Sequence, residues 1–535
     1  MAYRTHIHLL DNDSLLQIFS HYRLENEDNW NLRQAWRNIV HVCRRWRNLI
    51  YDSSSHLDLC LLLTNDSPSI DTLGHLPPLP LVIDYSDRTQ TIAQKDEDNI
   101  HLGLQQHGLV RRVVFEAQSS SLRMWLELMN KLFPRLGDLC LFSTTVEEVN
   151  PTLPETLQAP YLRCLSLHGI GLPKGLSLLS SVTALSTLSL TQIPGCCYLS
   201  PGNLVTQLQG LPHLEELSIS FAISTPLPSS EGELLHTPIP PVTLPTLKRL
   251  TFRGEDVYLD NLVAQVNTPL LEQLSLTFVF DTIFTLVNLT EFIHRTPWFG
   301  CPISRVIFKK DGPAINAGHY EKRDVGRLSL HVNCEPFDWQ IDSAIQVCIA
   351  LGKVISDVED LTLDLDVDGT PSDWKNPLDN SVWHELLLPF IGTKKLHIGS
   401  SLTLELSQAL ESVAGGLVLE LLPELQELEV QLEIDDQTKI AFSAFVETRE
   451  SVGRPIHLLV HRFNRTSTPE HGGYVGWIYR NQITNLISIC QTFIKAQEQT
   501  ICSYDELRRY YPEVISTINL HLTVVEVYVK PLTMR

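Results

Sequence analysis

The sequence lacks any long hydrophobic run, because no segment reaches about 18 apolar residues without a charged one. Its beginning also lacks the apolar core and the small-residue cleavage site of a secretory signal peptide. A helix that crosses a membrane needs about 20 predominantly apolar residues. We therefore expect a protein that is neither secreted nor embedded in a membrane and that resides in the cytoplasm or the nucleus.

Positive charge is also scarce. Lys and Arg number 41 against 62 Asp and Glu, so the formal net charge is −21. A chain this acidic repels the phosphates of nucleic acids and of anionic lipids. We therefore expect neither nucleic acid nor a membrane as its partner. Apolar residues make up 43% of the chain, which is enough to build a buried core and excludes wholesale disorder.

Catalytic and cofactor motifs are missing as well. The sequence contains neither G-x-x-x-x-G-K-[ST] nor G-x-G-x-x-G, the glycine-rich loops that cradle phosphates. The string HELLL, which begins at His384, has Leu388 where a zinc-binding helix carries its second histidine. The 11 cysteines form no C-x-x-C pair, so we expect free, buried thiols. These absences predict a protein with no cofactor, no metal ion and no active site of its own.

Two weaker candidates for chemistry remain. Cys43 is followed by two arginines, whose charges could lower the pKa of its thiol. Because Cys43 also lies on an apolar helical stripe, a packed cysteine is the simpler interpretation. Asp364, Asp366 and Asp368 alternate along a strand pattern and would share one face, which could suit calcium. An acidic patch on that face is again the simpler interpretation.

What the sequence has in abundance is a leucine repeat, x-L-x-x-L-x-L, whose second apolar position recurs at intervals of 22 to 35 residues. Clear copies occupy residues 134–141, 160–167, 183–190, 212–219, 245–252, 269–276, 357–363 and 423–430, and weaker ones lie at 110–115, 303–308, 325–330 and 393–398. Such periods are typical of leucine-rich repeats, in which each unit supplies one strand and one return helix or turn. The uneven intervals predict an α/β fold built as an irregular solenoid, with parallel strands on its concave face and helices outside.

The alternation of side chains along a strand predicts which face of the sheet each residue of the repeat motif lies on. The two leucines of L-x-L face the core, and the residue between them faces the concave surface. One interior column should therefore hold Leu165, Leu188, Leu217, Leu250 and Leu274.

The concave face should be negative, because several acidic residues lie in or beside the strand motifs. They include Glu215, Glu216, Glu272 and Asp364. A negative face would attract a basic client. The alternative is that the net charge serves solubility alone.

The chain divides by pattern into four parts. Residues 1–55 are predicted as a helical domain, 56–105 as a transition into the repeats, 106–440 as the irregular leucine-rich repeats, and 441–535 as a C-terminal cap. Within the cap, the sequence predicts helices over 474–496 and 503–510 and a strand over 520–529. A cap is expected because a solenoid must cover its exposed apolar end.

Two apolar stripes with helical spacing mark the first part. Leu15, Ile18 and Phe19 follow the polar cluster 11–14, which can cap a first turn, and a second stripe runs from Leu32 to Ile50. The string LDNDSLLQIF over 10–19, followed by VCRRWRNL over 42–49, resembles the F-box pattern L-P-x-E-x-L-x-x-I-F and V-C-[KR]-x-W-x-x-L. Together with the irregular repeats, it is similar to the F-box proteins of mushroom-forming fungi.

The resemblance implies the substrate-recognition subunit of a Skp-cullin-F-box ubiquitin ligase. Its F-box would bind the Skp adaptor, and through it a cullin, while the repeats would bind a protein client. An exposed apolar helical stripe agrees with a helix-packing interface. Carried over by position, the adaptor contacts, or the residues that hold the contacting helices, are Leu10, Leu15, Leu16, Phe19, Val42 and Trp46. The alternative is a repeat scaffold that has lost adaptor binding, since Asp11 stands where the family has proline.

Overall fold

A computed structural model gives the fold of the chain. It describes residues 10–24, 39–65, 78–86, 92–145, 150–173, 177–222, 241–279, 286–296, 299, 302–318, 327–334, 337–366, 380–412, 420–432 and 436–462. Everything below concerns these residues.

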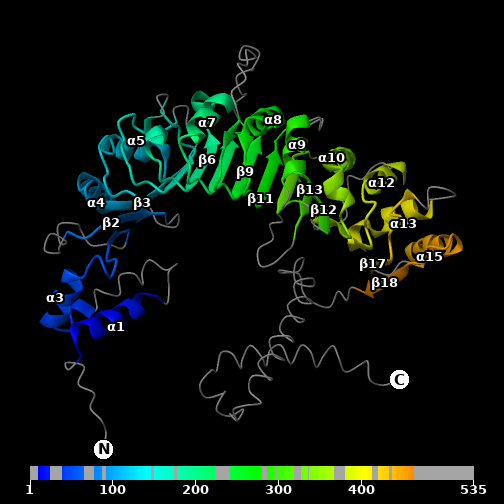
Figure 1. Ribbon diagram of the computed structural model, residues 1–535, viewed down its shortest axis with the longest axis horizontal. Helices are drawn as coiled ribbons and strands as arrows, with labels where there is room; N and C mark the ends of the chain where they lie inside the picture. The colour runs from blue at the N-terminus through cyan, green and yellow to red at the C-terminus, as the bar shows by residue number, and fades with distance from the viewer. Residues whose placement is uncertain are drawn as a thin grey trace, which may run out of the picture. The chain divides into compact units, whose positions relative to one another are not determined.

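A large, mostly parallel sheet of 16 strands organises the fold (Figure 1). The strands lie in the order β1-β2-β3-β4-β5-β6-β7-β9-β11-β14-β13-β12-β15-β16-β17-β18, and only β13 runs antiparallel to its neighbours. Their bounds are β1 Leu61–Leu63, β2 Leu81–Tyr85, β3 Val110–Ala117, β4 Asp138–Ser143, β5 Cys164–His168, β6 Thr187–Ile193, β7 Glu216–Phe221, β9 Arg249–Gly254, β11 Gln273–Phe278, β12 Ile303–Lys309, β13 Gly312–Ala317, β14 Leu328–Val332, β15 Asp360–Asp366, β16 Lys395–Ile398, β17 Glu427–Leu432 and β18 His457–Arg462. A separate parallel pair consists of β8 (Val242–Thr243) and β10 (Val266–Asn267).

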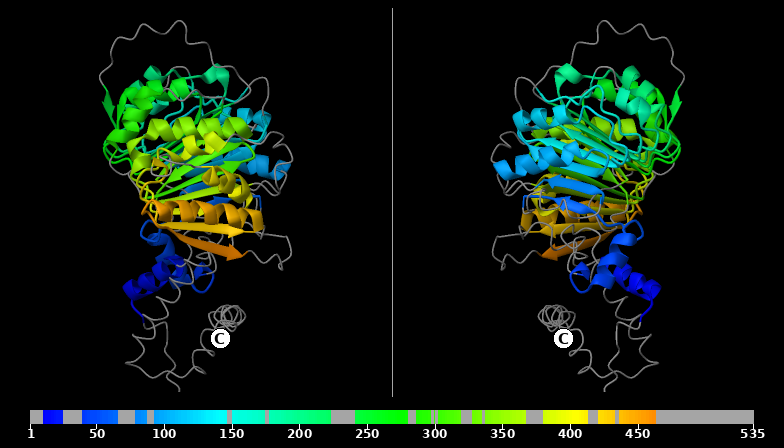
Figure 2. Two further views of the ribbon diagram at one scale, coloured as in Figure 1. Left: turned by 90° about the vertical axis from the view of Figure 1, so that its right-hand side faces the viewer. Right: turned by 90° about the vertical axis from the view of Figure 1, so that its left-hand side faces the viewer.

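Helices between successive strands lie along one side of this sheet, as Figure 1 shows for α5, α7, α8, α9, α10 and α12. Figure 2 views the sheet from its two ends, with β18 and α15 nearest the viewer on the left and β2 and α4 on the right. The helices of the described residues are α1 Asn12–Leu24, α3 Arg44–Asp52, α4 Gln94–Gln105, α5 Ser119–Leu128, α6 Ser177–Ser181, α7 Pro201–Leu208, α8 Asp256–Ala264, α9 Val287–Arg295, α10 Phe337–Leu351, α11 Lys353–Ser356, α12 Asn380–Leu387, α13 Thr403–Glu411 and α15 Asp436–Ser451, with 3-10 turns η4 Gly195–Cys197 and η7 Ser400–Leu402.

The core lies between the sheet and these helices. Alternate strand residues fill it, and strands that carry the L-x-L motif contribute its two apolar residues. The first leucines of the pairs are register partners on neighbouring strands and are almost fully buried: Leu165, Leu188, Leu217, Leu250 and Leu274. The predicted interior column is thus confirmed, and it continues to Leu328 on β14.

The order of the repeats breaks at β12 to β14. A hairpin between β12 and β13 makes β13 antiparallel, and β14, not β12, pairs with β11. Gly312 begins β13 with a φ of 133°, and a Cβ there would clash with the carbonyl oxygen of Val332, so glycine is required at this turn. The copies at 303–308 and 325–330, expected as consecutive units, therefore lie two strands apart in reversed order.

The sheet extends beyond the residues in which the repeat motif is clearest. Strands β1 and β2 belong to the segment 56–105, and β18 belongs to the segment 441–535. The elements predicted over 474–496, 503–510 and 520–529 lie outside the described residues. The four domain limits stay predictions.

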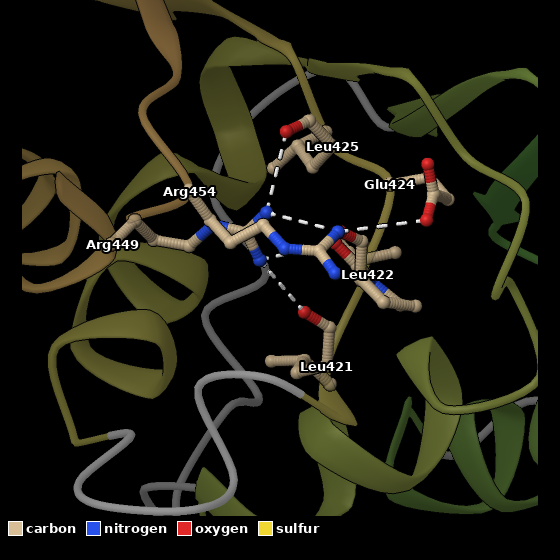
Figure 3. Close-up of polar contacts among 7 residues, drawn as sticks. Leu421, Leu422, Glu424, Leu425, Arg449 and Arg454 are labelled. Atoms are coloured by element: carbon tan, nitrogen blue, oxygen red, sulfur yellow. Dashed lines mark hydrogen bonds and ion pairs between the residues drawn. The ribbon is translucent and has the colours of Figure 1, made fainter. Parts of the chain in front are cut away.

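A buried arginine holds the turn that precedes β17 (Figure 3). Arg449 of α15 is 1% exposed and donates hydrogen bonds to the carbonyl oxygens of Leu421, Leu422 and Leu425 at 3.2, 3.1 and 3.3 Å. Arg454 donates to the carbonyl of Pro423 at 2.9 Å from a much more exposed position. Because buried carbonyl groups need partners, Arg449 allows this turn to lie against the core.

Replacing Leu217 with Ala should lower the free energy of unfolding by roughly 2–5 kcal/mol, because it empties a filled core site. Ser218→Ala, one residue along on the opposite face, should change it by less than about 0.5 kcal/mol. Urea unfolding followed by circular dichroism measures both. Equal losses in the two variants would contradict the assignment of faces.

Replacing Arg449 with Met should cost about 3 kcal/mol or more, because several buried carbonyl groups lose their donors at once. Arg454→Met is the matched control and should cost under about 1 kcal/mol, since its side chain is half exposed. The same unfolding measurement applies. A cost for Arg449→Met as small as the control's would show that the carbonyls find other partners.

Candidate functional site

The first candidate is the helical segment formed by α1 and α3. The side chain of Asp11 caps α1, because its Oδ1 accepts a hydrogen bond from the backbone N–H of Ser14 at 2.7 Å. This bond holds the pKa of Asp11 below its usual range. The family pattern has proline here, which suits a helix start by its fixed φ; Asp11 serves the same start by capping.

An arginine joins the two helices at this end. The guanidinium of Arg45, in α3, donates to the carbonyl oxygen of Leu10 at 2.7 Å and to Oδ1 of Asn12 at 2.8 Å. The start of α1 is thereby tied to the start of α3. The sequence pattern did not indicate this contact, because Arg45 lies more than thirty residues from Leu10 and Asn12 in the chain.

Aromatic packing joins the helices at a second point. The rings of Phe19 and Trp46 meet edge to face with centroids 5.1 Å apart, a favourable arrangement for aromatic pairs. Leu15 is fully buried and Phe19 is 7% exposed, and both belong to the hydrophobic core. Leu10, Leu16 and Trp46 pack half-buried against that core. The contact between Phe19 and Trp46 joins α1 to α3, and a role of these residues in adaptor binding stays a prediction.

Two large apolar side chains of this segment face outward. Val42 is 61% exposed and Ile18 is 47% exposed. Val42 was among the predicted contacts, whereas Ile18 was recognised only as part of the helical stripe. Leu32 and Trp36, at the start of the second stripe, lie outside the described residues. Cys43, the residue that precedes α3, has a free thiol and is half-buried.

The second candidate is the strand face of the sheet, opposite the helices. It carries the residue that lies between the two core leucines of each strand. Ion pairs connect neighbouring strands on it: Arg249 pairs with Glu216, Arg305 with Asp364 at 2.6 Å, and Lys395 with Glu427 at 3.2 Å. At the strand starts, Lys248 pairs with Glu215 at 2.9 Å.

These pairs change the expected electrostatics. Three of the four acidic residues that predicted a negative face, Glu215, Glu216 and Asp364, are each neutralised by a cation. The argument for a basic client therefore loses most of its support. The described residues contain no group of three or more His, Cys, Asp or Glu suited to a metal ion, and Asp368 lies outside them.

Histidine 397 forms the most buried charged cluster of this face. Its Nε2 lies 3.1 Å from Oδ1 of Asp360, and its Nδ1 lies 2.8 Å from Oε2 of Glu429. Burial by itself lowers the pKa of His397, but the hydrogen bond with Asp360 and the charges of Asp360, Glu429 and Glu427 outweigh it and raise the pKa overall. The imidazolium thus links β15, β16 and β17.

The other histidine and cysteine candidates have structural surroundings. His384, in the HELLL string, lies in α12 with its Nε2 2.7 Å from the carbonyl oxygen of Ala409. The eight cysteines within the described residues are all free, as predicted, but only three of them are buried, four are half-buried and Cys196 is exposed.

No protein-family model matches the chain, and no curated protein matches it. Among the described residues, no helix is long and apolar enough to cross a membrane.

The protonation of His397 makes stability depend on pH. At pH values above the ordinary histidine pKa of about 6.5, the unfolded chain releases this proton, whereas the folded protein retains it because its pKa is raised. The contribution is therefore fully present below about pH 6.5 and is lost as the pH rises through the raised folded-state pKa. His397→Gln should remove this pH-dependent loss of stability. The urea midpoint of the wild type should therefore exceed that of the variant most at about pH 6, and the difference should shrink as the pH rises to about 9.

His213→Gln serves as the control, because His213 is exposed and lies before β7. It should keep the pH dependence of the wild type. A His397→Gln variant with an unchanged dependence would show that the cluster does not hold the proton.

Proposed function

We propose that the protein is the substrate-recognition subunit of a Skp-cullin-F-box ubiquitin ligase. The segment with α1 and α3 is its F-box and binds the Skp adaptor, and through it a cullin. One observation carries the proposal: the residues that match the F-box pattern build a packed helical pair, beside which Ile18 and Val42 expose apolar surface. Exposed apolar side chains next to a packed helix pair favour a helix-packing partner.

The second part of the proposal is that the sheet and its helices are an irregular leucine-rich-repeat solenoid that binds the client. Support comes from the parallel strands, the leucine column and the helices gathered on one side. The strand face then presents side chains to a protein partner. This assembly is proposed to act in the cytoplasm or the nucleus, without catalysis of its own.

The capping by Asp11 bears on the alternative of a scaffold that no longer binds an adaptor. That alternative rested on the missing proline. Since Asp11 starts the helix by another means, the missing proline is no argument against a folded F-box. We therefore favour the ligase subunit over the scaffold.

The test is co-purification with a Skp adaptor and a titration of the purified complex. Ile18→Glu combined with Val42→Glu should weaken adaptor binding by well over about a hundredfold, because central apolar anchors each contribute roughly 2 kcal/mol or more. Exposed positions are chosen because truncating the buried Leu15 or Phe19 would disturb folding.

Val287→Glu is the control, since Val287 is 73% exposed on α9. It adds one negative charge on an exposed apolar side chain outside the α1 and α3 segment and should leave adaptor binding unchanged. If the wild type binds no adaptor, the scaffold is the better description. If the double variant binds as the wild type does, the contact surface lies elsewhere.

A further inference from the structure

Two cysteines lie close together on the strand face, on the neighbouring strands β4 and β5. Leu139 and Leu165 are register partners that face the core. Cys140 follows the first of these leucines and Cys164 precedes the second, so both cysteines face the opposite side and are diagonal neighbours across the strand pair. Both are half-buried free thiols, and their side chains are hydrogen-bonded to each other.

The hydrogen bond between the two thiols gives them different acidities. It lowers the pKa of Cys140 by more than burial raises it, and the charge of Arg112 lowers that pKa further against the charges of Asp138 and Asp84. The same hydrogen bond, together with burial, raises the pKa of Cys164. Cys140 is therefore the thiol that ionises first, while Cys164 stays protonated and donates to it. Because the thiolate and not the thiol is the nucleophile, Cys140 is the reactive member of the pair.

The buried cysteines of the described residues have a different environment. Cys60, Cys334 and Cys348 are all buried. Burial raises the pKa of Cys348 to about 12, so this cysteine remains a thiol at neutral pH. Cysteines buried in apolar surroundings are inert. Access to solvent and a partner thiol thus distinguish the pair on β4 and β5 from these three.

We propose that Cys140 and Cys164 form a modification site at which a hydroperoxide converts the two thiols into a reversible disulfide that links β4 to β5. Thiols that already share a hydrogen bond need only close to the S–S bond length of about 2.05 Å. A metal ion suits the pair less well, because the described residues offer no group of three or more ligands. The proposal requires neither an adaptor nor a client and so goes beyond the proposed function.

The oxidation takes place in two steps. First, the thiolate sulfur of Cys140 attacks the terminal oxygen of the hydroperoxide: an S–O bond forms, the O–O bond breaks, and the leaving oxygen takes up a proton. This step produces a sulfenic acid on Cys140. Second, the sulfur of Cys164 attacks the sulfenic sulfur: the S–S bond forms, the S–O bond breaks, and hydroxide leaves as water with the proton of Cys164. The two thiols lose two electrons and two protons, which the hydroperoxide gains.

The test treats the full chain with a small excess of hydrogen peroxide in a buffer free of metal ions. The remaining thiols are then blocked with N-ethylmaleimide, and disulfides are mapped by mass spectrometry of proteolytic peptides. In the wild type, a peptide pair that links Cys140 to Cys164 should appear before any other cysteine is oxidised. Dithiothreitol should restore both thiols by exchange. Cys140→Ser should slow the oxidation of Cys164 by about tenfold or more, because the reactive thiolate is gone.

The reciprocal variant separates the two roles. Cys164→Ser keeps a hydroxyl donor beside Cys140 but removes the thiol that closes the disulfide. The sulfenic acid should then accumulate on Cys140 and be trapped by dimedone, whereas Cys140→Ser should give no dimedone adduct on Cys164. Circular dichroism of both variants checks that the fold is kept, and the disulfide map of the wild type depends on neither variant.

Cys196→Ser is the control, because Cys196 is exposed and its sulfur lies 3.7 Å from that of Cys197. It should form the link between Cys140 and Cys164 at the rate of the wild type. If peroxide oxidises Cys196 first, or if Cys140 and Cys164 are not linked, accessibility and not the thiol pair governs oxidation and the proposal is overturned. A dimedone adduct on Cys164 in place of Cys140 would overturn the assignment of the nucleophile.

Discussion

The burial of one pair of apolar residues per strand, between the sheet and the helices behind it, is the constraint on which this fold depends. No single strand with its helix can bury that pair, so each unit needs the next. Leu217 illustrates the point, because its register partners Leu188 and Leu250 lie on the strands to either side. The same period of two that sends these leucines inward sends every intervening residue to the open face. Core and surface are thus assigned to alternate positions of one short motif.

The reversal at β13 shows that burial, and not strand direction, is what must be preserved. Antiparallel β13 keeps the alternation: Ile315 and Ala317 face the core as partners of Leu330 and Leu328. The alternation of side chains is the same whichever way a strand runs, so a strand can be reversed without exposing the core. The reversal instead constrains the turn before β13, where the backbone conformation requires glycine at Gly312.

The parts of the structure that the sequence predicted correctly are those set by local spacing. The leucine column followed from L-x-L, and the start of α1 followed from the capping potential of the cluster that includes Asp11. The reversed order of β12 to β14 was not predicted, because the weak repeat copies at 303–308 and 325–330 favour consecutive parallel strands, although Asp311-Gly312 between them is a hairpin signal. The neutralisation of the acidic face was also missed, because Glu216 and Arg249 come together through strand register and not through sequence proximity.

The helical segment shows why a site is harder to predict than a fold. A stripe such as Leu15, Ile18 and Phe19 identifies an apolar helix face, but the partner helix decides which of its members remain exposed. Here α3 brings Trp46 against Phe19 and leaves Ile18 outward. An interaction surface consists of the apolar side chains that remain exposed after the helices have packed. Which side chains these are depends on residues distant in the chain.

The same reasoning applies to charge on the strand face. The two charges of an ion pair between neighbouring strands largely cancel, so the pair exerts little net electrostatic attraction or repulsion on a binding partner. Arg249 with Glu216 and Arg305 with Asp364 are of this kind. Arg253 lies on β9, the same strand as Arg249, and forms no ion pair with a described acidic residue. In a chain with a net charge of −21, the electrostatic character of this face is therefore set by its few uncompensated positions and not by its composition. Because those positions lie outside the core, they can change without altering the leucine column that holds the fold.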